Sequence, residues 1–194
     1  MIQADDMFKA FEPHREDSVV IVTGTGGKHW AEHTTKQNRD LNMGGAMGHT
    51  TSAALGLALG LPDEKVVLFD SEGALLMNLG IIATIAGQKP KNFLHLLMDN
   101  ECYATTGGQP VPNSQEINYA GMAKEAGYTA AYSFDNIEDF TTNIGKIMKE
   151  DGPVFVAMKM VPEVENEPIG MRPRRATRSR AETITALRSE LGIS

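Results

Sequence analysis

Residues 65–86 read KVVLFDSEGALLMNLGIIATIA, and this stretch decides the fold class. Residues 65–69 are mainly apolar and β-branched, which is typical of a short buried strand. Residues 75–86 form a longer apolar run that predicts a helix, and the polar residues Asp-Ser-Glu-Gly at 70–73 separate the two. Because a strand, a loop and a helix follow one another in this order, the sequence indicates an α/β protein.

The same alternation continues on both sides of this stretch. Further strands are predicted at 18–23, 93–98 and 153–160, and further helices at 50–59, 119–126 and 137–150. Strands this apolar must be covered on both faces, so we predict a three-layer, doubly wound α/β fold with a mostly parallel sheet. We found no repeat or flexible linker, so residues 1–170 are expected to form one domain, followed by a basic tail or helix at 171–194.

Composition narrows the class of protein. Hydrophobic residues make up 41% and charged residues 22%, the balance of a folded globular chain. The N-terminus lacks a signal-peptide pattern, and no apolar run approaches the roughly 20 residues that span a membrane. Cys102 is the single cysteine, which fits a reducing compartment, and the net charge of -7 argues against nucleic acid as a partner. We expect a cytoplasmic protein that binds neither nucleic acid nor a membrane.

The charge is unevenly distributed along the chain. Arginines gather near the C-terminus, at Arg172, Arg174, Arg175, Arg178, Arg180 and Arg188. Such a segment is usually a solvated tail that ends in a short helix. The alternative is an arm that docks onto a partner subunit, and the sequence leaves both interpretations open.

The loops after the strands are the places where such folds bind ligands. The loop at 24–27, Gly-Thr-Gly-Gly, can bind phosphate through its backbone N–H groups or simply turn the chain. It follows neither the dinucleotide-binding pattern nor the P-loop pattern. Taken alone, this loop therefore does not establish a ligand site.

Acidic residues mark the other two strand ends, at 70–73 and 99–109. Asp70 and Glu72 follow one predicted strand, and Asp99 with Asn100 follows the next. Carboxylate, amide and carbonyl oxygens are the ligands that Mg²⁺ prefers. The alternative for each loop by itself is a set of solvated acids.

Four segments in a fixed order carry a family resemblance. They are GAMGH at 45–49, GALLMNLGIIATIA at 73–86, DNECY at 99–103 and TGGQ at 106–109. They are similar to GSMGHA, GALLMNLGSLATIA, DNEAY and TGGQ of phosphonopyruvate and sulfopyruvate decarboxylases, which use thiamine diphosphate. The metal signature of that superfamily, Gly-Asp-Gly and a later asparagine, resembles residues 71–73 with Asn100, which lies 28 positions after Glu72. Over residues 18–160 the chain thus resembles their diphosphate-binding (PP-type) domain.

The resemblance implies a set of metal and diphosphate ligands. Glu72 and Asn100 would bind Mg²⁺ through their side chains, and Cys102 through its backbone carbonyl. The N–H groups of Gly73 and Ala74 would bind the diphosphate of thiamine diphosphate at the start of a helix.

The resemblance also implies contacts with the rest of the cofactor. Gly24, Thr25 and Tyr103 would line the cofactor, and Gly45 would accept a hydrogen bond from its aminopyrimidine. Met47 would hold the cofactor in a bent conformation, which makes it the one catalytic residue that we assign within this chain. A thioether suits this position because it is apolar and adaptable, although a methionine can also simply pack in the core.

One part of the signature departs from the family. Glu72 stands where the family has aspartate, and Ser71 stands where it has the first glycine. Glutamate keeps the charge but is one methylene longer, and Mg²⁺ demands near-ideal geometry. Asp70 is the alternative ligand, although the register with Gly73 favours Glu72.

The resemblance covers only half of a complete active site. In the family, a glutamate that activates the cofactor comes from a separate pyrimidine-binding domain of ~150 residues. We therefore expect an α subunit that carries this domain, and an α/β hetero-oligomer with this chain as the β subunit.

The predicted function is that of a 2-oxoacid decarboxylase, a carboxy-lyase that converts 3-sulfopyruvate to sulfoacetaldehyde and CO₂. Lys28, His29 and His49 lie on candidate loops and could face the small anionic substrate, although each could equally be an ordinary solvated or packed side chain. Three alternatives stay open: a phosphonopyruvate decarboxylase, a carboligase of the acetolactate synthase kind, and a degenerate subunit that binds a partner without catalysis.

Overall fold

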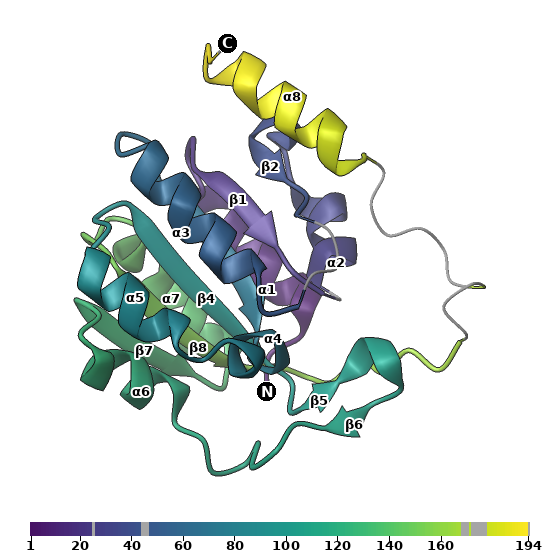
Figure 1. Cartoon of the computed structure of the whole chain (residues 1–194). Helices are drawn as coiled ribbons and strands as arrows, with labels where there is room; N and C mark the ends of the chain where they lie inside the picture. The colour runs from purple at the N-terminus through teal and green to yellow at the C-terminus, as the bar shows by residue number, and fades with distance from the viewer. Residues whose placement is uncertain (25, 44–46, 168–170, 172–177, 194) are drawn as a thin grey trace.

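The structure, a computed structural model, describes residues 1–24, 26–43, 47–167, 171 and 178–193. A six-stranded sheet in the order β2-β1-β3-β4-β8-β7 forms its centre, and every neighbouring pair is parallel (Figure 1). The strands are β1 (Val19–Val22), β2 (Asp40–Leu41), β3 (Val66–Ser71), β4 (Phe93–Asp99), β7 (Ala130–Phe134) and β8 (Val154–Lys159). The predicted α/β fold with a parallel sheet is confirmed.

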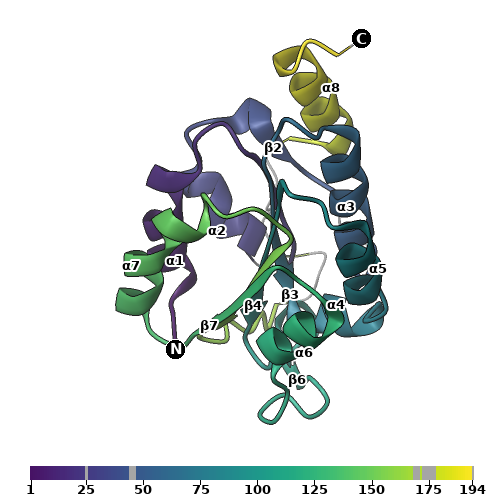
Figure 2. The same ribbon diagram turned by 90° about the vertical axis from the view of Figure 1, so that its left-hand side faces the viewer.

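Helices cover both faces of the sheet, as Figure 2 shows. One face carries α1 (Ala4–Phe11), α2 (Gly26–His33) and α7 (Ile137–Ile147). The other carries α3 (Thr50–Gly60), α5 (Ile81–Gln88) and α6 (Tyr119–Ala126), with α4 (Glu72–Met77) at its lower end and α8 (Arg180–Glu190) beyond β2. Each face has its own apolar core, because β3 and β4 send alternate side chains to opposite sides.

The order of the strands determines where a ligand can bind. The chain moves from β1 outward to β2 and then returns to the other side of β1 as β3. A second reversal places β8 between β4 and β7. In open parallel sheets, clefts for ligands form at the carboxyl ends of strands beside such reversals. The carboxyl ends of β1, β3, β4 and β8 are therefore the expected site.

Two predicted loops are shorter than the sequence suggested. Residues 70–73 do not form a loop, because β3 continues through Ser71 and α4 begins at Glu72. Ser71 makes this direct transition possible by capping the helix, with its Oγ accepting the N–H of Ala74 at 3.4 Å. Likewise, α2 already begins at Gly26, within the predicted loop at 24–27.

The apolar run at 75–86 is two helices rather than the predicted single one. α4 ends at Met77 and α5 begins at Ile81. Asn78 leaves the helical region with φ -143° and ψ 48°, and its side-chain amide donates to the carbonyl of Gly48 at 2.9 Å. The break thus ties α4 to the segment that contains Met47. Apolar character alone could not reveal it.

Several elements were not predicted from the sequence: α1, α2, β2, β7 and the short strands β5 (Cys102–Tyr103) and β6 (Gln109–Pro110). β2 has two residues, and β7 is a half-exposed edge strand, so neither carries a continuous apolar signal. α1 buries Met7, Phe8 and Phe11 against the sheet. None of the described helices is both long and apolar enough to cross a membrane.

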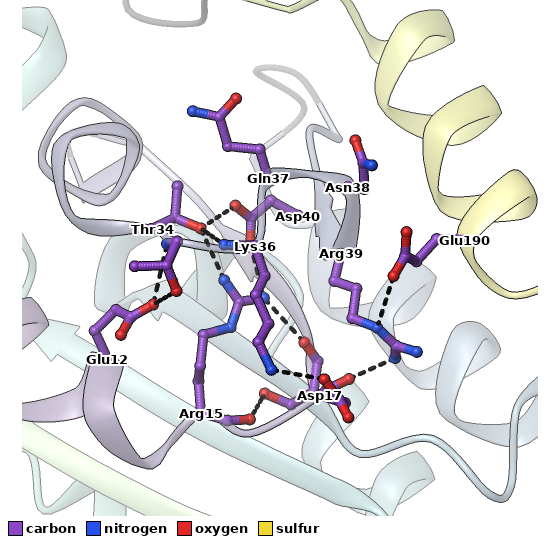
Figure 3. A network of polar contacts seen from close by, with 12 residues as sticks. Glu12, Arg15, Asp17, Thr34, Lys36, Gln37, Asn38, Arg39, Asp40 and Glu190 are labelled. Atoms are coloured by element: carbon purple, nitrogen blue, oxygen red, sulfur yellow. Dashed lines mark hydrogen bonds and ion pairs between the residues drawn. The ribbon is translucent and has the colours of Figure 1, made fainter.

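A buried arginine anchors the β2 edge of the sheet. Arg15, which is 1% exposed, lies 3.1 Å from Asp40 Oδ1 and donates to Thr34 Oγ1 at 2.8 Å (Figure 3). Its guanidinium also lies over the ring of Trp30, 5.1 Å from the centroid. Because a buried charge is costly without partners, this network fixes β2 and the segment that precedes it.

The C-terminal helix α8 packs against its own chain at this edge. Ser179 and Glu182 form a capping box at its start, and Leu187 is buried in the core. Arg39 Nε lies 3.9 Å from Glu190 Oε1 (Figure 3). α8 lies where a short terminal helix was expected, and docking of this segment onto a partner stays a prediction. Three of the six arginines fall outside the described residues: Arg172, Arg174 and Arg175.

Candidate functional site

Three strand ends meet at the carboxyl edge of the sheet. The register pairs Ser71 of β3 with Met98 of β4, so Glu72, the first residue of α4, and Asp99, the last residue of β4, are neighbours. The register of β4 with β8 pairs Asp99 with Lys159. The strand register therefore places Glu72, Asp99 and Lys159 side by side, although they are far apart along the chain.

Glu72 is the most unusual group at this edge. Its side chain is fully buried, and neither carboxylate oxygen has a hydrogen-bond partner within the described part of the chain. Burial, helped by the neighbouring Asp99 carboxylate, raises the pKa of Glu72 from 4.5 to about 7, although the nearby backbone N–H groups of Glu72, Asn100 and Gly73 act in the opposite direction. An unpartnered buried carboxylate is costly, so this position calls for a cation.

Asp99 is the second buried acid. Its Oδ2 lies 2.8 Å from Lys159 Nζ, whereas its Oδ1 is buried without a partner among the described residues. Burial raises the pKa of Asp99, although the ion pair with Lys159 opposes this effect. Glu72 and Asp99 thus present three unsatisfied oxygen atoms at one edge of the sheet.

The turn after β4 carries the other two predicted metal ligands. Asn100 Oδ1 accepts the N–H of Cys102 at 3.2 Å. In the hairpin of β5 (Cys102–Tyr103) and β6 (Gln109–Pro110), Val111 donates to the carbonyl of Glu101 at 3.0 Å. Because hydrogen-bonded and non-bonded pairs alternate in an antiparallel hairpin, the N–H and C=O of Cys102 point away from β6. The Cys102 carbonyl is thus directed to the side where its N–H meets Asn100.

The first turn of α4 is packed closely beneath Tyr103. A Cβ atom on Gly73 would lie 2.6 Å from Tyr103 Cε1, so the aromatic ring can lie here only because residue 73 has no side chain. Ala74 is buried, and its N–H points to the capping hydroxyl of Ser71. The structure thus brings together Glu72, Gly73, Ala74 and Tyr103, four of the residues predicted to bind the cofactor or its metal.

Asp70, the alternative ligand, has a different environment. Its Oδ2 accepts a hydrogen bond from Thr51 at 2.5 Å and lies 3.3 Å from His95 Nε2, while its Oδ1 accepts the N–H of Ser71 at 2.9 Å. His95 Nδ1 in turn lies 3.3 Å from the hydroxyl of Tyr128. Both oxygens of Asp70 are therefore occupied within the protein, in contrast to those of Glu72.

The two glycine-containing segments at 24–27 and 45–49 are only partly described. Gly24 is exposed and adopts φ +58°, a left-handed conformation that suits glycine. The predicted cofactor contacts Thr25 and Gly45 lie outside the described residues. Met47 is 37% exposed, so it is not a core methionine in this chain.

The three candidate cations for an anionic substrate differ in their surroundings. His29 is buried, and its two ring nitrogens each lie 2.8 Å from a carboxylate, of Asp5 and of Glu163. Burial favours neutral His29, but these two hydrogen bonds outweigh it and raise the pKa. His29 thus pairs internally, whereas His49 is exposed at the start of α3. The side chain of Lys28 is not described.

Comparison with known proteins identifies the family. Residues 22–158 match the family described as thiamine pyrophosphate enzyme, C-terminal TPP binding domain. The chain belongs to this family. It therefore carries a thiamine diphosphate-binding domain, and the matched residues include β3, α4, β4 and the β5–β6 hairpin.

Relatives of this thiamine diphosphate-binding domain include two kinds of decarboxylase. The chain is 36% identical over 143 residues to phosphonopyruvate decarboxylase of Streptomyces hygroscopicus, covering 73% of this chain and 35% of that protein. It is 36% identical over 131 residues to sulfopyruvate decarboxylase subunit beta of Methanothermobacter thermautotrophicus, covering 68% and 67%. The chain thus spans about a third of the phosphonopyruvate decarboxylase that it matches.

A solved structure shows the same fold. Benzoylformate decarboxylase from Polynucleobacter necessarius superimposes with a TM-score of 0.69 at 16% identity, covering 87% of this chain and 34% of that protein. At this identity the likeness concerns the fold alone.

The residues at the carboxyl edge fit a divalent cation held together with a diphosphate. Glu72 supplies an unpartnered anionic oxygen, which is what a cation requires. Within the described ranges, no group of three or more His, Cys, Asp or Glu side chains could hold a metal by itself. An amide oxygen, a backbone carbonyl and ligand oxygens would therefore have to complete the coordination, which is the donor set expected of this thiamine diphosphate-binding domain.

Two residues at this edge were missed by the sequence analysis. Lys159 ends the last strand, and a lysine after the apolar run PVFVAM is a signal that could have been noticed. Tyr119 is 2% exposed, and its hydroxyl has no partner in the described part of the chain. Burial raises its pKa, and Asp99 and Glu72 contribute to the same effect, so Tyr119 lies within electrostatic reach of both acids.

Proposed function

We propose that this chain is the β subunit of a thiamine diphosphate-dependent 2-oxoacid decarboxylase. The observation that carries the proposal is Glu72, a fully buried carboxylate with two unpartnered oxygens at the carboxyl edge of a thiamine diphosphate-binding domain. What supports a metal-ligand role is that no ion pair neutralises Glu72 among the described residues, whereas Asp99 and Glu101 both pair with Lys159.

In the proposed site, this chain holds the diphosphate end of the cofactor. Glu72, Asn100 and the carbonyl of Cys102 bind Mg²⁺, and the occupied oxygens of Asp70 argue against it as the ligand. The first turn of α4, with the N–H groups of Gly73 and Ala74, receives the diphosphate. When bound, thiamine diphosphate supplies the electron sink that the loss of CO₂ from a 2-oxoacid requires.

Further residues contact the rest of the cofactor in this proposal. Met47 supports its bent conformation, and its exposed side chain is available for that contact. The remaining proposed contacts are Gly24, Thr25, Gly45 and Tyr103.

A separate α subunit completes the proposed enzyme. What supports a partner is the name of the Methanothermobacter thermautotrophicus relative, sulfopyruvate decarboxylase subunit beta, of which this chain covers 67%. The α subunit would contribute a pyrimidine-binding domain and the glutamate that activates the cofactor. The resulting assembly is a cytoplasmic α/β hetero-oligomer.

The proposed substrate is 3-sulfopyruvate, which yields sulfoacetaldehyde and CO₂. Phosphonopyruvate is the second candidate, because the phosphonopyruvate decarboxylase of Streptomyces hygroscopicus is equally similar, at 36% identity. Both substrates carry an anionic head group, and His49 is the exposed candidate to meet it.

The experiment compares this chain alone with the chain reconstituted with its α subunit. We expect CO₂ release from 3-sulfopyruvate only in the reconstituted enzyme with thiamine diphosphate and Mg²⁺. Phosphonopyruvate and pyruvate are tested as alternative substrates. Faster turnover of phosphonopyruvate would make it the substrate in place of 3-sulfopyruvate, and formation of acetolactate from pyruvate would favour a carboligase.

Calorimetry tests the cofactor site independently of turnover. Thiamine diphosphate with Mg²⁺ is titrated into the reconstituted wild type and into Glu72→Ala and Asn100→Ala. We expect Mg²⁺-dependent binding that both substitutions abolish, because each removes an oxygen ligand. Wild-type protein that binds no cofactor would identify a degenerate subunit, and unchanged affinity in both variants would refute the metal assignment.

A further inference from the structure

Lys159, the last residue of β8, contacts both neighbours of Asn100. Its Nζ lies 2.8 Å from Asp99 Oδ2 and 2.8 Å from Glu101 Oε1. The same ammonium donates to the backbone carbonyl of Ser114 at 3.3 Å. An ammonium group has three donors, and here all three are used. One side chain thus joins the end of β4, the following turn and a distant loop.

The turn that Lys159 holds is conformationally demanding. Glu101 adopts φ +63°, a left-handed conformation that is strained for a non-glycine residue. Such a conformation persists only where the surroundings hold it. The Val111 hydrogen bond holds the Glu101 backbone, and Lys159 holds its side chain. The position of Asn100 therefore depends on contacts made by the residues on either side of it.

Lys159 also determines how Asp99 is oriented. Because Oδ2 of Asp99 is bound to Lys159, its Oδ1 is the oxygen left buried and without a partner in the part of the chain that the structure describes. Asp99 follows Met98, which pairs with Ser71, the residue before Glu72, and the two acids interact electrostatically. The ion pair thus keeps the charge of one buried acid satisfied while Glu72 stays free for a ligand.

We propose that Lys159 is a positioning residue of the metal site, which aligns the Asn100–Cys102 turn for a divalent cation by holding Asp99 and Glu101. This inference rests on the proposed function, because it concerns the same cation. Lys159 touches neither the metal nor the substrate in this proposal. Groups that orient metal ligands in this way commonly change metal affinity by about 10–100-fold when they are removed.

Electrostatics and positioning predict opposite effects of losing Lys159. A nearby ammonium repels a divalent cation, so a purely electrostatic role predicts tighter metal binding once the charge is removed. A positioning role predicts weaker binding, because the Asn100 and Cys102 oxygens are no longer aligned. The sign of the change therefore distinguishes the two.

The test uses Lys159→Met in the full chain together with its α subunit, and Lys36→Met as the matched control. Lys36 likewise contacts a carboxylate, Asp17 at 2.6 Å, and a backbone carbonyl, Glu16 at 2.8 Å, but on another part of the surface. Calorimetry measures the affinity for Mg²⁺ at a saturating concentration of thiamine diphosphate. We expect about 10–100-fold weaker binding for Lys159→Met and no more than about twofold for the control, which lies outside the site.

Amide hydrogen exchange provides a readout that needs no cofactor. Residues 99–103 should exchange faster in metal-free Lys159→Met than in wild type, whereas the control should leave them unchanged. Glu101→Gln is the second variant, because it weakens one contact and leaves the buried Asp99–Lys159 pair intact. It should show a smaller change in the same direction.

The outcomes separate this inference from the proposed function. Wild-type protein that binds no cofactor refutes the proposed function, whereas hydrogen exchange still tests the role of Lys159 in the turn. Unchanged or tighter Mg²⁺ binding in a folded Lys159→Met protein overturns the inference, as does unchanged exchange at residues 99–103. Weaker binding with faster exchange, and neither change in Lys36→Met, supports it.

Discussion

Replacing Glu72 with glutamine should stabilise the cofactor-free chain at alkaline pH and leave its stability unchanged in acid. The pKa of Glu72 is about 7 in the folded protein and 4.5 ordinarily, because burial disfavours the carboxylate. Between these two pH values the native state keeps a proton that the unfolded state has lost. Stability must therefore fall as the pH rises through this window. Each pKa unit corresponds to about 1.4 kcal/mol, so the full cost above the window is about 3 kcal/mol.

The assay is urea unfolding of wild type and Glu72→Gln at about pH 4.5 and about pH 8.5, on either side of the window. Glutamine has nearly the shape of protonated glutamate, so the comparison isolates the charge. Relative to wild type, the free energy of unfolding of the variant should increase by about 3 kcal/mol from the lower to the higher pH. Glu125→Gln on the exposed face of α6 is the control and should change stability by less than about 0.5 kcal/mol at both.

The reasoning would be refuted by a wild-type chain whose stability, relative to Glu72→Gln, does not decline with rising pH. A second comparison asks whether the cofactor and its metal offset the loss of stability that the buried Glu72 carboxylate causes. Thiamine diphosphate with Mg²⁺ should stabilise wild type at alkaline pH through preferential binding to the native state. Glu72→Gln should gain much less, because an amide offers the cation no charge.

The remaining predictions concern Met47 and Gly73. Met47→Leu should retain most of the turnover of the reconstituted enzyme. Met47→Ala should lower kcat strongly, with little change in cofactor affinity or melting temperature. A fall in melting temperature with unchanged kcat would instead assign Met47 to packing. Gly73→Ala should cost about 1–3 kcal/mol in urea unfolding, because its Cβ would lie 2.6 Å from the Tyr103 ring. Tyr103→Ala in the same chain should remove most of this penalty, and an unrelieved penalty would locate the strain elsewhere.

Much of the fold could be predicted from the sequence, because its signal is local. β3, β4 and β8 are short and mostly apolar runs, and such runs are typical of strands buried on both faces. The edge strands β2 and β7 lack this signal since they are short or half-exposed. The break at Asn78 was missed because residues on both sides of it are equally apolar.

The chemistry of the site was also visible in part. The order of the motifs identified the thiamine diphosphate-binding domain, and the register with Gly73 pointed to Glu72 rather than Asp70. That preference could not be justified from the sequence alone, because the sequence does not show which of the two carboxylates is hydrogen-bonded within the protein. In the structure, the oxygens of Asp70 accept hydrogen bonds from Thr51 and Ser71, and those of Glu72 accept none among the described residues.

The sequence by itself determined the apolar strands, the acids at their carboxyl ends and the family of the chain, since these depend on residues close together. Only the tertiary structure decided which acid is unpartnered and which cation holds the Asn100–Cys102 turn. Lys159 lies 60 positions beyond Asp99 along the chain, and the two meet because β8 returns to pair with β4. Burial and strand register act between residues distant in sequence, so they set the pKa of Glu72 and the position of Lys159 only once the sheet has formed.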